Sequence, residues 1–82
     1  MSENTKDDIF QWLQERLKSD FQLSVEDLQP TAHLMDDLDL DSIDAVDLSI
    51  RVEEKYDLSL SQEDLKSMQT IRDVVDLIHE RL

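Results

Sequence analysis

The absence of glycine restricts the fold of this chain more than any other feature of its 82 residues. Turns must depend on Asp, Asn, Ser and the single proline, Pro30, because Asp and Asn are the non-glycine residues that best accept left-handed backbone. β-Branched residues also never alternate regularly with polar ones, as they do in half-buried strands. We therefore predict an all-α fold.

Apolar residues at helical spacing predict a small bundle of three longer helices and one short helix. We expect the second helix to bury a broad face that includes Ile43, Val46 and Ile50. The long connection before it lacks a period, and we expect its leucines to pin it onto the helices. The predicted helices cover about residues 6–19 (capped by Asn4 or Thr5), 42–56 (capped by Asp41 or Ser42), 61–68 and 70–82.

Length and charge restrict the class of protein. Eighty-two residues predict one domain, residues 1–82, with little room for a deep catalytic pocket. The 21 acidic and 8 basic residues give a net charge of -13, which repels nucleic-acid phosphates and anionic lipid. We therefore expect no nucleic-acid partner, and we expect protein partners that carry basic patches.

Cysteine content and hydropathy point to the compartment. The chain has no cysteine, which excludes disulfides and thiolate chemistry and fits a reducing cytoplasm. No apolar run approaches the roughly 20 residues of a membrane span, and the polar first residues are unlike a secretory signal. We expect a cytoplasmic monomer without stable membrane insertion.

The titratable residues do not form a catalytic group. Ser42 lies among carboxylates and aliphatic residues, and a nucleophilic serine needs a base, usually histidine. The two histidines, His33 and His79, lie far apart in the sequence and do not have metal-ligand spacing. Adjacent carboxylates, such as Asp36 and Asp37, are better explained as solvated surface than as a general acid and base. We therefore predict that the chain is not an enzyme.

Asp37, Asp39 and Asp41 alternate as the first ligands of a calcium loop do. Such a loop needs glycine at its sixth position and glutamate at its twelfth, where this chain has Ser42 and Leu48. We therefore predict no specific metal site, and weak cation association with the acidic residues stays open.

Ser42 stands at the predicted start of the second helix, and an ordinary helix cap would explain it. A second explanation is chemical, because the free N–H groups at a helix N-terminus favour a phosphate ester there. Exposed acidic residues follow the serine and can orient a basic enzyme over it. On this interpretation Ser42 is a substrate for another protein.

The residues around Ser42 closely resemble the acyl carrier protein family. The family signature, Asp-Ser followed by an aliphatic residue and then acidic and apolar residues, is read here as DSIDAVDL at residues 41–48. The stretches LMDDL (34–38), EEKY (53–56) and TIRDV (70–74) match the family's loop before the serine, its second helix and the start of its last helix. The resemblance covers nearly the whole chain.

The resemblance implies a carrier without catalytic activity. A phosphopantetheinyl transferase would move 4′-phosphopantetheine from coenzyme A onto Ser42, and the arm would carry acyl groups as thioesters. Acyl-loading, ketosynthase, reductase and dehydratase-type enzymes of fatty-acid or polyketide-type biosynthesis would be its partners. Inward residues such as Val46, Leu48, Ile50 and Leu65 would line a cavity for the acyl chain. The docking face would comprise Asp41, Asp44, Asp47, Glu53 and Glu54.

The sequence departs from the pattern of fatty-acid carriers at four positions. Asp39 stands where those carriers usually have glycine, Ser49 replaces an aliphatic residue, and Arg51 and Lys55 add positive charge to an acidic helix. We therefore hypothesise a dedicated carrier of a specialised pathway. Two alternatives stay open: a peptidyl or aminoacyl carrier, and an acidic protein-binding module without a prosthetic group.

Overall fold

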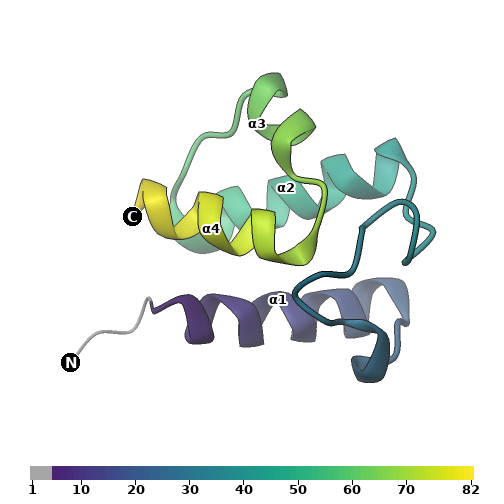
Figure 1. Ribbon diagram of the computed structural model, residues 1–82. Coiled ribbons are helices and arrows are strands. Elements are labelled where there is room, and N and C mark those ends of the chain that lie inside the picture. The colour runs from purple at the N-terminus through teal and green to yellow at the C-terminus, as the bar shows by residue number, and fades with distance from the viewer. Residues whose placement is uncertain (1–4) are drawn as a thin grey trace.

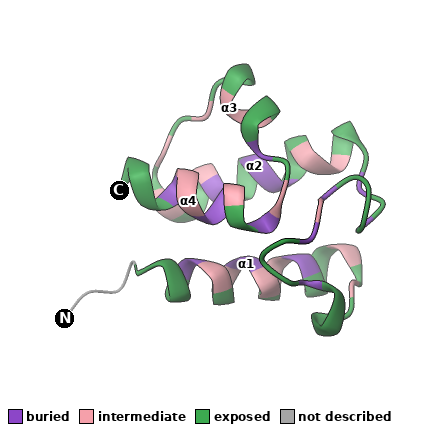
Figure 2. Cartoon of the chain, in the orientation of Figure 1, coloured by how far each residue is buried: buried purple, intermediate pink, exposed green. Residues whose placement is uncertain are grey.

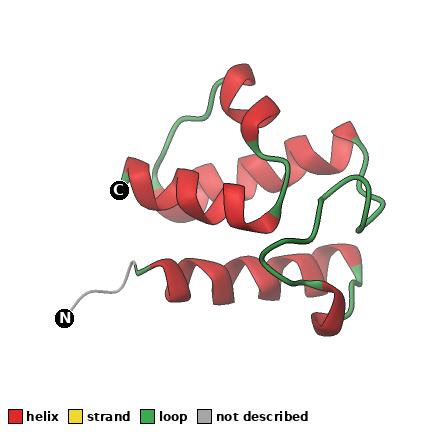
Figure 3. Ribbon diagram, in the orientation of Figure 1, coloured by secondary structure: helices red, strands yellow, loops and turns green. Residues whose placement is uncertain are grey.

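The computed structural model describes residues 5–82, which form a helical bundle (Figure 1). No strand occurs in this part of the chain, which contains one isolated antiparallel bridge between His33 and Thr70 (Figure 3). The all-α prediction, with three longer helices and one short one, is confirmed. The elements are α1 (Lys6–Phe21), the 3-10 turn η1 (Val25–Asp27), α2 (Ser42–Tyr56), α3 (Gln62–Ser67) and α4 (Ile71–Arg81).

Each α-helix begins at a side chain that accepts a hydrogen bond from the N–H group of its third residue. The hydroxyl of Thr5 accepts from the N–H of Asp8 at 3.2 Å, so Thr5 caps α1. Asn4, the other residue considered for this role, lies outside the described residues. α2, α3 and α4 begin with reciprocal capping boxes, which satisfy two free backbone N–H groups each.

Two helices end at residues with left-handed backbone, and neither residue is glycine. α1 runs two residues beyond its predicted end, to Phe21, and Gln22 then adopts φ 56°. α2 ends at Tyr56, as predicted, and Asp57 adopts φ 55°. Left-handed backbone at this position lets N–H groups after the helix reach its last carbonyls.

The core lies among α1, α2 and α4, with α1 and α4 facing each other across it (Figure 1). The buried positions of α1 lie on the side turned toward α4 (Figure 2). Trp12 on α1 also packs edge-on against Tyr56 on α2, with ring centroids 5.3 Å apart. The fully buried larger side chains are Ile9, Leu13, Leu17, Leu28, Leu48, Val52, Ile71, Val74 and Ile78.

The long connection between α1 and α2 is fastened to the turn between α3 and α4. The N–H of Leu34 donates to the carbonyl of Gln69 at 2.8 Å, and the N–H of Arg72 donates to the carbonyl of Pro30 at 2.9 Å. The four leucines expected to pin this connection are buried: Leu28, Leu34, Leu38 and Leu40. This connection therefore holds the start of α2 in a fixed relation to α3.

Candidate functional site

Ser42 is the first residue of α2, and its side chain is exposed. The residue before it, Asp41, caps the helix through a 2.9 Å hydrogen bond from the N–H of Asp44. The Ser42 hydroxyl makes no hydrogen bond with another described residue, whereas Thr5, Ser61 and Thr70 use theirs as caps. An ordinary capping role therefore does not explain this serine.

The residues before Ser42 form a tight loop that fixes its position. The N–H of His33 donates to Asp37 Oδ2 at 2.7 Å, and the N–H of Leu40 donates to the carbonyl of Leu34 at 3.1 Å. Asp39, which stands where the resemblance led us to expect glycine, adopts φ 57° and therefore has left-handed backbone. Asp is among the residues that tolerate this conformation, so the loop keeps its shape without glycine.

The start of α2 suits a phosphate ester at Ser42. The first N–H groups of a helix and its positive dipole end favour an anion beside them. Asp41 and Asp44 occupy part of this region, because the N–H of Asp41 donates back to Asp44 Oδ2 at 3.3 Å. The Ser42 hydroxyl lies outside this reciprocal pair and is exposed to solvent. The residues present therefore fit a covalently attached phosphopantetheine.

The apolar stripe of α2 that we expected to be buried is exposed. The exposed fractions are 73% for Ile43, 46% for Val46 and 47% for Ile50. The prediction was wrong because α2 has two apolar sides, and the one with Leu48 and Val52 faces the core. At 100° per residue, Ile43, Val46 and Ile50 project from the opposite side.

Acidic residues border this exposed stripe. Asp47 and Glu54 lie within about 60° of Ile43 and Ile50 around the axis of α2, and both are exposed. Neither carboxylate makes a hydrogen bond or an ion pair with any residue between 5 and 82. The start of α2 therefore leads into a surface that is apolar along its centre and acidic at its edge. The acidic residues of this surface were predicted and the exposed apolar ones were not, although their angular positions on α2 place both on one side.

Two charged residues of α2 beside this surface make contacts outside the helix. The Oε2 atom of Glu53 accepts a hydrogen bond from the N–H of Leu60 at 2.8 Å, which holds the loop between α2 and α3. Arg51 Nε lies 2.9 Å from Asp20 Oδ2 at the end of α1, so it does not form the Asp47 pair that helical spacing allows. The positive charge of Arg51 is therefore paired with Asp20 between α2 and α1.

The four residues expected to line an acyl cavity do not meet. Val46 and Ile50 are on the exposed side of α2, and Leu48 is in the core. Leu65 lines a pocket of about 260 Å³ between α3 and the loop before Ser42. The other residues that line it are His33, Met35, Lys66, Met68 and Gln69.

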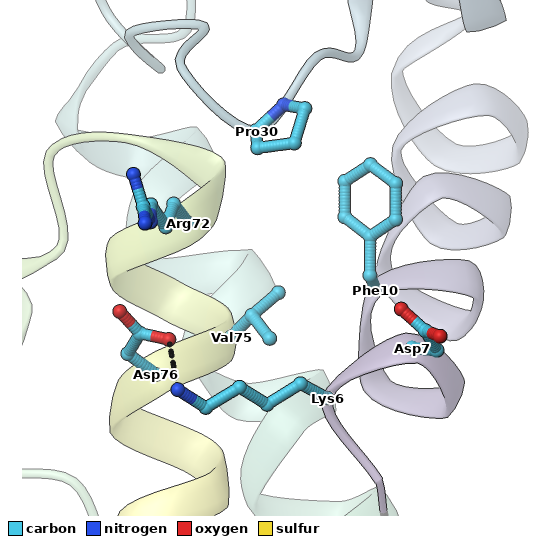
Figure 4. A pocket seen from close by; sticks show the side chains of 7 residues that line it. All are labelled: Lys6, Asp7, Phe10, Pro30, Arg72, Val75 and Asp76. Atoms are coloured by element: carbon cyan, nitrogen blue, oxygen red, sulfur yellow. Dashed lines mark ion pairs between the residues drawn. The ribbon is translucent and has the colours of Figure 1, made fainter.

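A second groove, of about 320 Å³, lies between α1 and α4 (Figure 4). Lys6 reaches across it to Asp76, with Nζ 3.1 Å from Oδ1, and Phe10 and Val75 project into it (Figure 4). None of its lining residues comes from α2 or from the loop at residues 33–41. It therefore contains no predicted site residue.

No three His, Cys, Asp or Glu side chains between residues 5 and 82 are grouped so that they could hold a metal ion. No helix in the same range combines the length and the apolar character needed to cross a membrane.

A family model and two similar relatives give the same family. Residues 11–78 match the family described as "Phosphopantetheine attachment site". The acyl carrier protein of Coprothermobacter proteolyticus is 38% identical over 77 residues, which cover 94% of this chain and 94% of that protein. Acyl carrier protein 2 of Ralstonia nicotianae is 35% identical over 78 residues, covering 95% of this chain and 96% of that one.

A solved structure shows the same fold. The acyl carrier protein of Enterococcus faecalis superposes with a TM-score of 0.82, covering 95% of this chain and 99% of that chain. The sequence identity is 22%, so this likeness concerns the fold alone.

Proposed function

Because this chain belongs to the acyl carrier protein family, we propose that Ser42 is the residue that bears its 4′-phosphopantetheine arm. The predicted carrier function and the covalent 4′-phosphopantetheine are confirmed by the family. The members of this family are carriers, so the protein is not an enzyme. The arm supplies a terminal thiol that holds acyl groups as thioesters.

The main support for this assignment is that Asp41, and not Ser42, caps α2. Asp41 takes the capping role, which leaves the adjacent hydroxyl exposed at the positive end of a helix. In the transfer, the Ser42 oxygen bonds to the phosphorus of the pantetheine arm, and the pyrophosphate bond of coenzyme A breaks. The adenosine bisphosphate portion leaves, and the hydroxyl proton passes to a base of the transferase.

We also propose that α2 is the docking face. Members of the family interact with phosphopantetheinyl transferases and with biosynthetic enzymes. The exposed apolar stripe supports contact with a partner, because moving three neighbouring aliphatic side chains out of water lowers the free energy of binding. Acidic residues at its edge would steer partners with basic patches. The predicted docking residues are Asp41, Asp44, Asp47, Glu53 and Glu54, to which we add Ile43, Val46 and Ile50.

The pathway is a further proposal. We propose a dedicated carrier for a specialised acyl or polyketide-type pathway, with loading, ketosynthase, reductase or dehydratase-type enzymes as partners. Lys55 supports it, because it adds an exposed positive charge to α2, where its Nζ lies 6.0 Å from the Tyr56 ring centroid. Arg51 supports it less, because Asp20 neutralises its charge. That residues 1–82 form a single carrier domain and that the protein is a cytoplasmic monomer also stay predictions.

Intact mass tests the attachment site. The protein and its Ser42→Ala variant would be incubated with coenzyme A and a promiscuous phosphopantetheinyl transferase. We expect a mass gain of one phosphopantetheine in the wild type and none in the variant. A gain in Ser42→Ala would move the arm to another residue, and no gain in either would remove the proposal. Circular dichroism of Ser42→Ala would confirm that the variant is folded.

A further inference from the structure

The pocket between α3 and the loop before Ser42 has two walls that backbone hydrogen bonds hold together. Its two walls are joined by the 2.8 Å hydrogen bond from the N–H of Leu34 to the carbonyl of Gln69, and by the bridge between His33 and Thr70. The same loop continues to the Asp41 cap of α2. The loop that supplies His33 and Met35 to the pocket therefore continues to Ser42.

The lining of this pocket differs in charge from the rest of the surface. The chain has 21 acidic residues, and none of them lines the pocket. Met35, Leu65 and Met68 supply apolar walls. Lys66 supplies a positive charge, and among residues 5–82 it has no ion-pair partner. A pocket of this kind favours a ligand with an apolar body and a negatively charged end.

The polar lining residues are donors. Lys66 offers three N–H groups, and the side-chain amide of Gln69 offers two. The Nδ1 atom of His33 accepts a hydrogen bond from the N–H of Asp36 at 3.3 Å. The same Nδ1 atom lies 3.8 Å from Asp36 Oδ2, so the ring is engaged with Asp36. A carboxylate, which accepts hydrogen bonds only, complements the donors of Lys66 and Gln69.

We propose that this pocket shelters a short acyl group that ends in a carboxylate, held on the protein's own arm, with Lys66 as the residue that selects it. The proposal rests on the attachment of the arm at Ser42. An arm of about sixteen bonds spans roughly 20 Å when extended, so it can fold back along the loop that leads from Ser42 to the pocket. The volume of about 260 Å³ suits a short chain rather than a long one.

General electrostatics predicts that a carboxylate on the acyl group lowers the stability of this protein, whereas binding of that carboxylate in the pocket would raise it. The protein already carries a net charge of -13, so an added negative charge without a binding site would lower its stability. A carboxylate held by Lys66 would raise it. The sign of the change therefore separates the two explanations.

The experiment compares two acyl groups of equal carbon number. The transferase would load the protein from glutaryl-coenzyme A or from pentanoyl-coenzyme A, and intact mass would confirm loading on Ser42. We expect the glutaryl form to unfold about 4–8 °C above the pentanoyl form, the shift that an ion pair at the strong end of the range for an exposed lysine gives in a domain of this size. In Lys66→Met we expect this difference to fall below about 2 °C, within the usual effect of a surface substitution.

Lys18→Met is the matched control. Lys18 and Lys66 are both exposed and both lie in the last turn of a helix, so their interactions with the helix dipole are alike. Lys18 does not line the pocket, and its variant should keep the full difference between the two acyl forms. Equal or reversed midpoints in the wild type would overturn the proposal, and so would a difference that persists in Lys66→Met. If the wild type gains no mass, the proposed attachment of the arm at Ser42 fails, and the proposal for the pocket fails with it.

Discussion

Replacing Gln22 by glycine should stabilise this protein, although glycine usually destabilises helical proteins. Gln22 follows the last residue of α1 with φ 56°, and its N–H group donates to the carbonyl of Leu17. Left-handed backbone costs a residue with a Cβ atom about 1–2 kcal/mol, and glycine does not bear this cost. The Gln22 side chain is exposed and makes no hydrogen bond with another described residue. Little is therefore lost when it is removed.

The magnitude follows from two opposing effects. Relief of the left-handed strain is reduced by about 0.5–1 kcal/mol, because glycine has more conformational freedom in the unfolded chain. The net gain should be about 0.5–1 kcal/mol, or an increase of roughly 2–8 °C in the midpoint of thermal unfolding. Circular dichroism of the helices and the fluorescence of Trp12, which packs on Tyr56, both report the transition.

Gln11→Gly is the matched control, because Gln11 is an exposed residue inside α1. The same substitution there should cost roughly 0.5 kcal/mol, since glycine is a weaker helix former than glutamine. The two variants should shift the midpoint in opposite directions. If Gln22→Gly is neutral or less stable than the wild type, the left-handed backbone of Gln22 does not carry the assigned cost.

Two further predictions concern side-chain carboxylates. Glu53→Ala should lower stability by about 1–3 kcal/mol, because it leaves the N–H of Leu60 without its acceptor. Glu54→Ala should change stability by less than about 0.5 kcal/mol and should slow the transferase reaction. Thermal unfolding and the rate of mass gain distinguish these two effects, and equal stability of the two variants would contradict the assigned role of Glu53. The N–H of Ser61 and then the guanidinium of Arg81 hold the pKa of Asp64 below its ordinary value of 3.8. This contribution to stability is therefore present above the ordinary pKa and disappears as the pH falls through the lowered one. Asp64→Asn should unfold at a lower temperature than the wild type at pH 7, and the two midpoints should converge at pH values below the lowered pKa; a gap that persists there would exclude this origin.

Local signals in the sequence predicted most of the helix boundaries. Ser61 with Asp64 and Thr70 with Asp73 are capping pairs, and each marks the observed start of a helix. The end of α1 was missed by two residues, because no glycine or asparagine marks it and a glutamine takes the left-handed position. A cap depends on a few adjacent residues, whereas this helix end depends on how far α1 can continue against the core.

The side of α2 that faces the core could not be derived in the same way. Both of its sides are apolar, so periodicity alone does not say whether Ile43 or Leu48 is buried. The choice is made by tertiary contacts with helices far away in the sequence. Charge offers the missing signal, because Asp47 and Glu54 lie on the side of Ile43 and would be costly to bury.

The exposure of three aliphatic side chains on one helix has a physical consequence for how this carrier works. A domain this small gains from each apolar side chain that it buries, so an exposed aliphatic stripe forgoes part of its own stability. The stripe begins one residue after Ser42 and continues along α2 beside carboxylates that have no partner within residues 5–82. An enzyme that covers this stripe is thereby brought next to the serine that we assign to the arm. Contact with α2 and access to the arm are consequently one event, and a substitution on the stripe should impair every partner that approaches Ser42 along this helix.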